Sequence, residues 1–189
     1  MDVVSNILAA FGLSSSAGLN AYLPLLVVAL TARFSNLIEL KAPWNALESP
    51  WTIGVLVVLL IVEFFADKTP AINHVNDVIQ TFVRPTAGAI LFAASTGVVS
   101  NMDPVVAIVL GLLTAGAVHA TKSVLVRPAV TAATGGVANP VVGLVEDVIA
   151  LLLSVVAVVL PVLISAVIIL LTALILWWLW RRSNHYSRA

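Results

Sequence analysis

The sequence has no cysteine among its 189 residues. Disulfide bridges, thiolate metal sites and cysteine nucleophiles are therefore excluded. Charge is also scarce, because charged residues make up 10% of the chain whereas a soluble domain carries about a quarter. The nine basic and nine acidic residues cancel, so the charge balance gives no reason to expect a nucleic acid as partner.

Long apolar runs take the place of the missing charge. Hydrophobic residues make up 61% of the chain, and the mean hydropathy is +1.11. A soluble fold of this size cannot bury that much apolar surface, so we expect an integral membrane protein in contact with the lipid bilayer. The Leu, Val, Ile and Ala runs do not alternate with polar residues, which excludes a barrel and favours helices. We predict an all-α polytopic membrane protein with about six membrane segments, some of them broken or re-entrant.

The first apolar segment, residues 3–32, has an unusual middle. Three serines, two glycines, Asn20 and Pro24 interrupt it between positions 12 and 24. Two interpretations stay open. Gly and Ser allow neighbouring helices to approach closely, or the helix is broken so that its backbone lines a cavity.

Five charged residues and a histidine lie between Glu63 and Pro85. The apolar run that precedes Glu63 is too short to cross a bilayer alone, so we expect Glu63 inside the membrane. Pro70 is expected to end this helix, and the next helix is expected to begin near Asn73. The ionisable residues of the stretch are Glu63, Asp67, Lys68, His74, Asp77 and Arg84.

Residues 73–84 have the spacing of an amphipathic helix. Val75, Val78, Ile79 and Phe82 share one face, and the opposite face carries His74, Asp77, Thr81 and Arg84. The residue before a proline is disfavoured in a helix, so we predict a kink at Arg84–Pro85.

The second half contains further polar groups between apolar runs. His119 and Lys122 close a segment that starts at Pro104, and Arg127–Pro128 follows. The run of small residues at 129–138 predicts neither a firm helix nor a solvated loop. Two shorter motifs complete the region: Gly135–Gly136, whose backbone N–H groups suit an anion, and Asn139–Pro140, a strong helix start.

The last apolar stretch, 140–180, contains no polar loop. A single helix of this length would measure roughly 60 Å, about twice the hydrocarbon thickness. We therefore predict two crossings hinged near Leu160–Pro161, which places Glu146 and Asp147 within the bilayer. The alternative is a tilted helix with both carboxylates among the headgroups. The aromatic and basic residues that follow predict a cytoplasmic C-terminus; they are Trp177, Trp178, Trp180, Arg181 and Arg182.

Two stretches align by eye and predict an internal repeat. The alignment makes Lys68 the counterpart of Lys122, and Asp77 the counterpart of Asp147. We expect one membrane domain over residues 1–189, with repeat halves 1–100 and 101–181 and a tail at 182–189. Internal duplication with interrupted segments is typical of transporters.

The central run ADKTPAINHVNDVIQTFVRPTAGA, together with AGLNAYLP, HATK, TGG-x-x-NP and EDV, resembles a bacterial family of small integral membrane proteins known only as a domain of unknown function. The resemblance covers nearly the whole chain. It implies a multi-helix protein of the bacterial inner membrane and brings no activity with it.

The residues favour a small transporter or channel-like protein that handles an ion or a small anionic solute, with proton coupling through its carboxylates and histidines. One alternative is a structural or partner-binding membrane protein whose charges only form ion pairs. A second is a scramblase or an enzyme acting on lipid headgroups. No cofactor or metal site is predicted, an enzyme is disfavoured, and a homo-oligomer is compatible with the sequence. The candidate binding residues are Glu63, Asp67, Lys68, His74, Asp77, Arg84, His119, Lys122, Arg127, Gly135, Gly136, Asn139, Glu146 and Asp147.

Overall fold

The structure is a computed structural model that describes the backbone of residues 3–68, 70–96 and 102–186. The side chains it describes are those of residues 5–66, 76–96, 102–160, 174, 177 and 181. Within these ranges the regular secondary structure is helical, and no strand occurs. The prediction of an all-α fold is confirmed.

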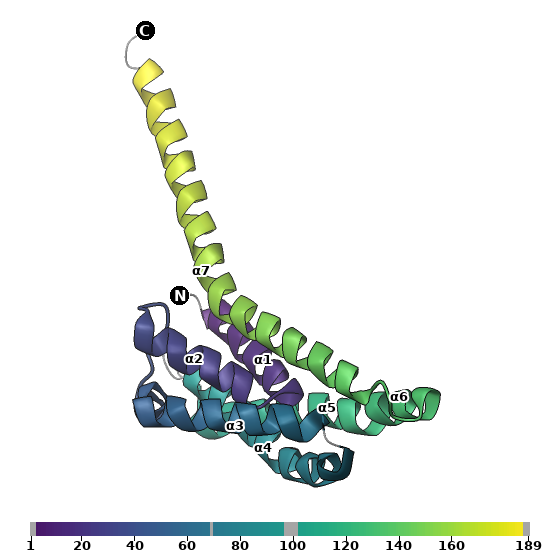
Figure 1. The fold of residues 1–189 in the computed structure, drawn as a ribbon. Helices are drawn as coiled ribbons and strands as arrows, with labels where there is room; N and C mark the ends of the chain where they lie inside the picture. Colours follow the sequence, from purple (N-terminus) through teal and green to yellow (C-terminus); the bar gives the residue numbers. More distant parts are fainter. Residues whose placement is uncertain (1–2, 69, 97–101, 187–189) are drawn as a thin grey trace.

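The first apolar segment is broken at Asn20. Helix α1 covers Val3–Leu19, helix α2 covers Tyr22–Phe34, and α2 leaves the end of α1 in a new direction (Figure 1). The Asn20 side-chain oxygen accepts the backbone N–H groups of Tyr22 and Leu23, each at 3.0 Å. An asparagine at a helix start stabilises the helix by satisfying these otherwise unpaired donors. The sequence-based interpretation of a broken helix is therefore confirmed.

Helix α1 contacts α4, α5 and α7, and its small residues make these contacts close. The Ser14 hydroxyl donates to the Gly88 carbonyl at 2.8 Å, and the Ser16 hydroxyl donates to the Ala150 carbonyl at 2.7 Å. A Cβ atom added at Gly18 would lie 2.6 Å from a backbone oxygen of α5. Close packing through small residues, the other interpretation left open by the sequence, therefore also holds.

A short 3-10 helix η1 (Trp44–Glu48) leads into α3 (Pro50–Lys68), and α4 covers Pro70–Thr96. Pro70 thus begins α4, and the predicted start near Asn73 is wrong. Proline suits the first helical position because the N–H it lacks has no partner there. Helix α4 also continues through Arg84 and Pro85. The buried contacts of Arg84 outweigh the local preference against helix before a proline.

Helix α4 is amphipathic, as predicted, but its polar side faces the protein interior. Val78 is 64% exposed and Phe82 is 73% exposed, whereas Gln80 and Arg84 are each 1% exposed. An apolar surface around a polar interior is the reverse of the pattern in a soluble protein. It suits a helix whose outer face lies against lipid.

Helix α5 (Pro104–Thr121), the π-helical turn η2 (Lys122–Val126) and α6 (Arg127–Thr134) form one continuous helical run. The π turn appears as a bond from the Arg127 N–H to the Lys122 carbonyl, five residues back. Pro128 explains it, because its ring would clash with the carbonyl four residues earlier in a regular α-helix. Helix α6 ends at Gly135 and Gly136, which adopt φ values of 64° and 88°.

Helix α7 covers Asn139–Tyr186 as one helix of 48 residues. The predicted start at Asn139–Pro140 is confirmed. The sequence predicted two crossings hinged near Leu160–Pro161. Helix α7 is bent but continues through Pro161 without a break (Figure 1), so the hinge is no interruption and the two crossings stay a prediction. A proline inside a helix can bend it without ending it.

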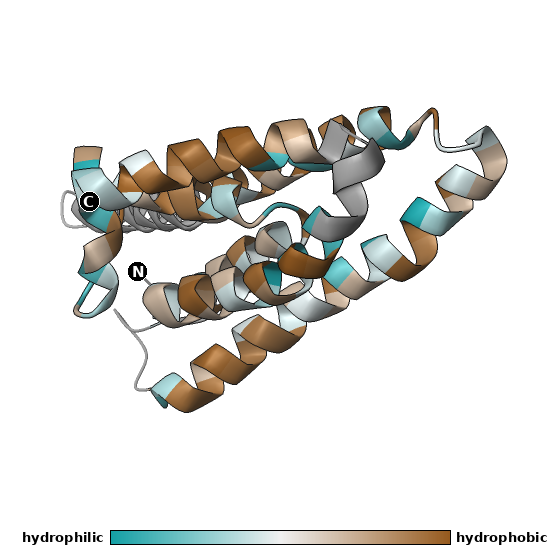
Figure 2. Cartoon of the chain, turned by 60° about the horizontal axis from the view of Figure 1, so that its bottom comes forward, coloured by the Kyte–Doolittle hydropathy of each residue, from teal (hydrophilic) through white to brown (hydrophobic). Residues whose placement is uncertain are grey.

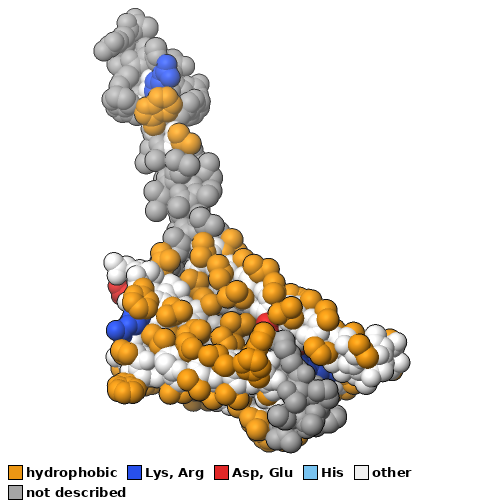
Figure 3. Space-filling model, viewed as in Figure 1, with side chains coloured by type: hydrophobic (Ala, Val, Ile, Leu, Met, Phe, Trp, Pro, Cys, Tyr) orange, Lys and Arg blue, Asp and Glu red, His pale blue; other side chains and the backbone are white. Residues whose placement is uncertain are grey.

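Three helices of the described part are long and apolar enough to cross a membrane: Asn76–Thr96, Pro104–Thr134 and Asn139–Leu160. Two shorter apolar helices are Tyr22–Phe34 and Pro50–Ala66. Hydrophobic residues run along the long helices (Figure 2), and charged groups interrupt the hydrophobic surface of Figure 3 at only a few places. These features are compatible with a membrane protein, and the number of six crossings stays a prediction.

Helices α4 and α5 cross at Gly88 and Gly111. A Cβ atom on Gly88 would meet the Ala115 side chain and would lie 2.9 Å from the Gly111 carbonyl oxygen. A Cβ atom on Gly111 would meet the Gly88 carbonyl oxygen. The two backbones can approach this closely only without side chains.

We expect Gly88→Leu to destabilise the protein by about 1–3 kcal/mol or more, since the added side chain forces the two backbones apart. The measurement is thermal loss of monodisperse protein in detergent. Gly54→Leu on α3 is the matched control, because a Cβ atom there meets nothing within 4 Å. Equal losses for both variants would contradict the close crossing.

Candidate functional site

A buried ion pair joins α3 to α4. Arg84 donates to Glu63 Oε1 at 2.9 Å, and the side chains are 1% and 2% exposed. Their burial inside a largely apolar protein is costly for each charge alone, so each requires the other. Glu63 is thus buried inside the protein, and its place within the membrane stays a prediction.

His119 lies beside this pair and contacts Arg84 and Thr81. Arg84 Nη1 is 3.2 Å from His119 Nδ1, and a guanidinium can only donate, so Nδ1 accepts. The Thr81 hydroxyl donates to the Asp77 carbonyl at 2.8 Å, so its oxygen is left to accept a proton from Nε2 at 3.2 Å. Donor counting thus assigns His119 as a neutral ring protonated at Nε2.

A second group of charges continues from the first. Arg127 donates to Asp77 Oδ1 at 2.8 Å, and Glu146 Oε2 forms an ion pair with the Lys122 ammonium at 2.6 Å. The same Glu146 oxygen lies 3.8 Å from Arg127. Lys122 also donates to the Leu19 backbone carbonyl at 3.0 Å, where α1 ends.

The two groups form one cluster around His119. Arg84, Lys122, Asp77 and Arg127 all lie within electrostatic reach of its ring. Helices α3 to α7 each contribute, together with the break between α1 and α2. The structure therefore brings acids and bases from distant parts of the chain together.

Asp147 lies at the edge of this cluster. Its carboxylate accepts the Asn20 side-chain N–H at 2.9 Å, so Asn20 joins α7 while its oxygen caps α2. The predicted equivalence of Asp77 and Asp147 finds no matching contact, because Asp77 binds an arginine and Asp147 binds an amide. The internal repeat stays a prediction.

Three predicted binding residues have local roles in the turn between α6 and α7. Gly135 and Gly136 end α6, and the Asn139 side chain donates to Thr131 at 2.9 Å. Their contact with an anion stays a prediction. Three further predicted residues, Asp67, Lys68 and His74, lie outside the described side chains.

Sequence reasoning left several groups out of the predicted site. Asn20 and Thr81 stood out as polar residues but were assigned no partner. Gln80, which is 1% exposed, was not singled out. The Leu19 carbonyl could not be predicted from residue type, because it is a backbone group that the helix break leaves free to accept a hydrogen bond.

A family model matches residues 7–182. The chain belongs to the family described as Domain of unknown function (DUF4126). The DUF4126 match includes every residue of the cluster. No curated protein and no solved structure matches the chain.

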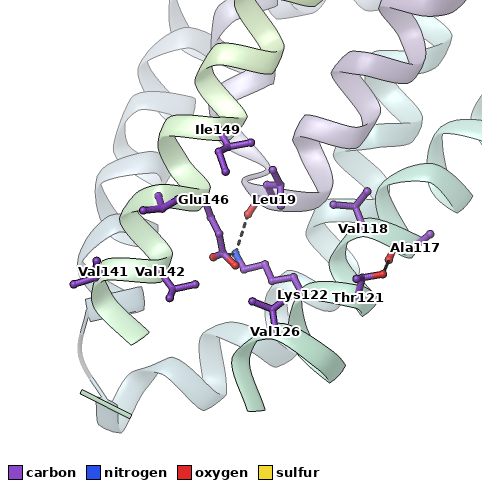
Figure 4. Close-up of a pocket in the computed structure, with 11 residues that line it drawn as sticks. Leu19, Ala117, Val118, Thr121, Lys122, Val126, Val141, Val142, Glu146 and Ile149 are labelled. Carbon is purple, nitrogen blue, oxygen red and sulfur yellow. Dashed lines mark hydrogen bonds and ion pairs between the residues drawn. The ribbon is translucent and has the colours of Figure 1, made fainter. Parts of the chain in front are cut away.

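A cavity of about 530 Å³ lies against the cluster in this DUF4126 chain. It is formed by the end of α1, by α5 with η2, and by the first turns of α7 (Figure 4). Lys122 and Glu146 point toward each other in the middle of it. The remaining lining is almost entirely aliphatic.

We expect Arg84→Met to cost about 3–5 kcal/mol of stability, because Glu63 then loses its buried cation. Replacing Glu63 by Leu in the same chain should recover most of this loss. Unfolding in mixed micelles, arranged as a double-mutant cycle, measures the coupling between the two side chains. Additive losses would show that the two charges do not stabilise one another.

Proposed function

We propose that the protein is a small membrane transporter or channel-like protein whose buried charge cluster is the binding and coupling site. One observation carries the proposal: ionisable side chains from distant parts of the chain meet between helices, three of which are candidate membrane spans. Ionisable groups at such depth are costly and are characteristic of substrate and proton pathways. We place the protein in the bacterial inner membrane with its C-terminus in the cytoplasm.

His119 is the group through which we expect protons to act. Its Nδ1 atom accepts a hydrogen bond from Arg84 only while this nitrogen is unprotonated. Protonation at Nδ1 replaces this attraction with the repulsion of two cations, so Arg84 must move or strengthen its contact with Glu63. Proton uptake at His119 is thereby linked to the geometry of the ion pair that joins α3 and α4.

Glu146 is the second element of the proposed mechanism. It contacts both Lys122 and Arg127, and Arg127 is also held by Asp77. A carboxylate shared by two cations can leave one of them without losing all its stabilisation. This arrangement allows a transported anion to take the place of Glu146 on a cation, as exchange sites require.

A structural role is the second candidate function, and the closed ion pairs favour it. The contacts at Glu63, Asp77 and Glu146 lie between 2.6 and 2.9 Å, and the adjacent cavity is lined by apolar side chains. The pairs are not local, however, because they join separate helices. The two functions differ in what charge neutralisation does to flux in a folded protein.

Asp77→Asn should abolish ion flux and leave the protein folded. The amide keeps the size of the side chain and removes the charge that holds Arg127. The measurement is flux across proteoliposomes, with a panel of ions and a pH-sensitive dye inside. Glu39→Gln, at an exposed loop position, is the control. A folded Asp77→Asn protein with full flux would remove Asp77 from the transport site, and absence of flux in the unaltered protein would support the structural role.

His119→Gln should retain flux and lose its dependence on pH, because glutamine can accept from Arg84 but cannot take up a proton. The flux assay is repeated from about pH 4 to 8, a range wide enough to include the charge change of a histidine that is surrounded by cations. Thr114→Ser serves as the control, since Thr114 lies on α5 and bonds only to the Leu110 carbonyl among the described contacts. An unchanged pH profile in His119→Gln would remove His119 from the mechanism.

A further inference from the structure

The cavity beside the cluster differs chemically from a site for a bare ion. Its walls are mainly valine, leucine, isoleucine and alanine side chains. Thr121 also lines it, but the Thr121 hydroxyl donates to the Ala117 carbonyl of its own helix at 2.8 Å (Figure 4). The Lys122–Glu146 pair is therefore the charged feature that a ligand meets there.

The cavity lies on two of the candidate membrane spans. Most of its walls come from Pro104–Thr134 and Asn139–Leu160, and Val145 in the wall is 50% exposed. A ligand can therefore enter sideways from the hydrocarbon phase. The volume of about 530 Å³ lies in the ordinary range for a pocket that holds a small organic molecule.

The charges at the cavity favour an anion over a cation. A lysine ammonium has three N–H donors, and among the described residues its acceptors are Glu146 and the Leu19 carbonyl. Glu146 already contacts two cations, Lys122 and Arg127. A ligand cation would have to compete with both, whereas a ligand anion meets a lysine with donor capacity to spare.

We propose that this cavity binds an anionic amphiphile with a single hydrocarbon chain, whose carboxylate or phosphate pairs with Lys122. The chain lies against the aliphatic walls, and the head takes part or all of the place of Glu146 on the ammonium. Glu146 then remains beside Arg127. The inference rests on the proposed function in taking the cluster as the binding site, and it names the substrate class of that site.

The test uses the full chain in nanodiscs of phosphatidylcholine, which carries no net charge. The probe is palmitate with a photoreactive diazirine in its chain, and mass spectrometry locates the labelled residues after irradiation. We expect labels within residues 117–126 and 141–149. Unlabelled palmitate and lysophosphatidate should both compete, and competition by one of them alone would identify the preferred head. Methyl palmitate should compete about tenfold less well, the loss expected from one charge-assisted hydrogen bond.

Two results in this experiment would overturn the proposal. The first is labelling spread evenly over all exposed apolar faces. The second is better competition by hexadecyltrimethylammonium or by inorganic phosphate than by palmitate. Better competition by hexadecyltrimethylammonium would show that a cation is preferred. Better competition by inorganic phosphate would show that the hydrocarbon walls contribute nothing.

Val145→Trp should fill the cavity and reduce labelling about tenfold or more. Val148→Trp is the matched control, since Val148 lies on the same helix, is also 50% exposed and does not line the cavity. Equal labelling of both variants would place the probe elsewhere.

The role of the charge is tested with Lys122→Met combined with Glu146→Gln. This double variant removes both members of the ion pair, so neither is left as a buried charge without the other. This variant should still bind the hydrocarbon chain of the probe. Unlabelled palmitate and methyl palmitate should then compete equally well for it. A retained preference for palmitate would remove Lys122 from the site. Labelling of the cavity does not require transport. Labelling without flux would therefore support this ligand site and contradict the proposed transport. Flux without labelling would support transport and contradict this ligand site.

Discussion

The contact between Arg84 and Glu63 is the constraint on which the rest of the structure depends. A guanidinium that is 1% exposed, inside a protein with an apolar surface, cannot remain without a carboxylate. Satisfying it fixes how α3 lies on α4 and where His119 must be. The direction of α4 follows, with its polar side inward and its apolar side outward.

The second constraint is the close approach of helices through small residues. Ser14, Ser16 and Gly18 let α1 lie in the middle of the bundle, and the break after Leu19 frees a carbonyl for Lys122. The π turn at Lys122 has its cause six residues later, in Pro128. Such turns are rare and occur often at functional sites. Close packing and charge pairing therefore occur at the same place, the C-terminal end of α1.

The sequence predicted the helical class because this class follows from composition and spacing. The stripe of Asp77 and Arg84 is readable from helical periodicity, and the pairing of residues across the chain follows from the cost of burying charge. The partner of each charge was not predictable, since nothing local tells whether Asp77 meets Lys122 or Arg127. The single helix α7 was missed because a length argument assumed that every apolar residue must lie within the bilayer. The break at Asn20 was one of two open interpretations. The contacts of Asn20 explain the break, and those of Ser14 and Ser16 show that close packing holds as well.

The absence of cysteine from the chain makes the central claim, that distant polar side chains meet inside the bundle, directly measurable. Asn20→Cys and Asp147→Cys replace two short side chains whose polar atoms lie 2.9 Å apart. In intact membranes under mild oxidation, we expect this pair to form a disulfide within one molecule. The pair Asn20→Cys and Glu39→Cys should stay reduced, because Glu39 is exposed in a loop. Failure of the first pair to cross-link, in a protein that is folded and inserted, would contradict the account.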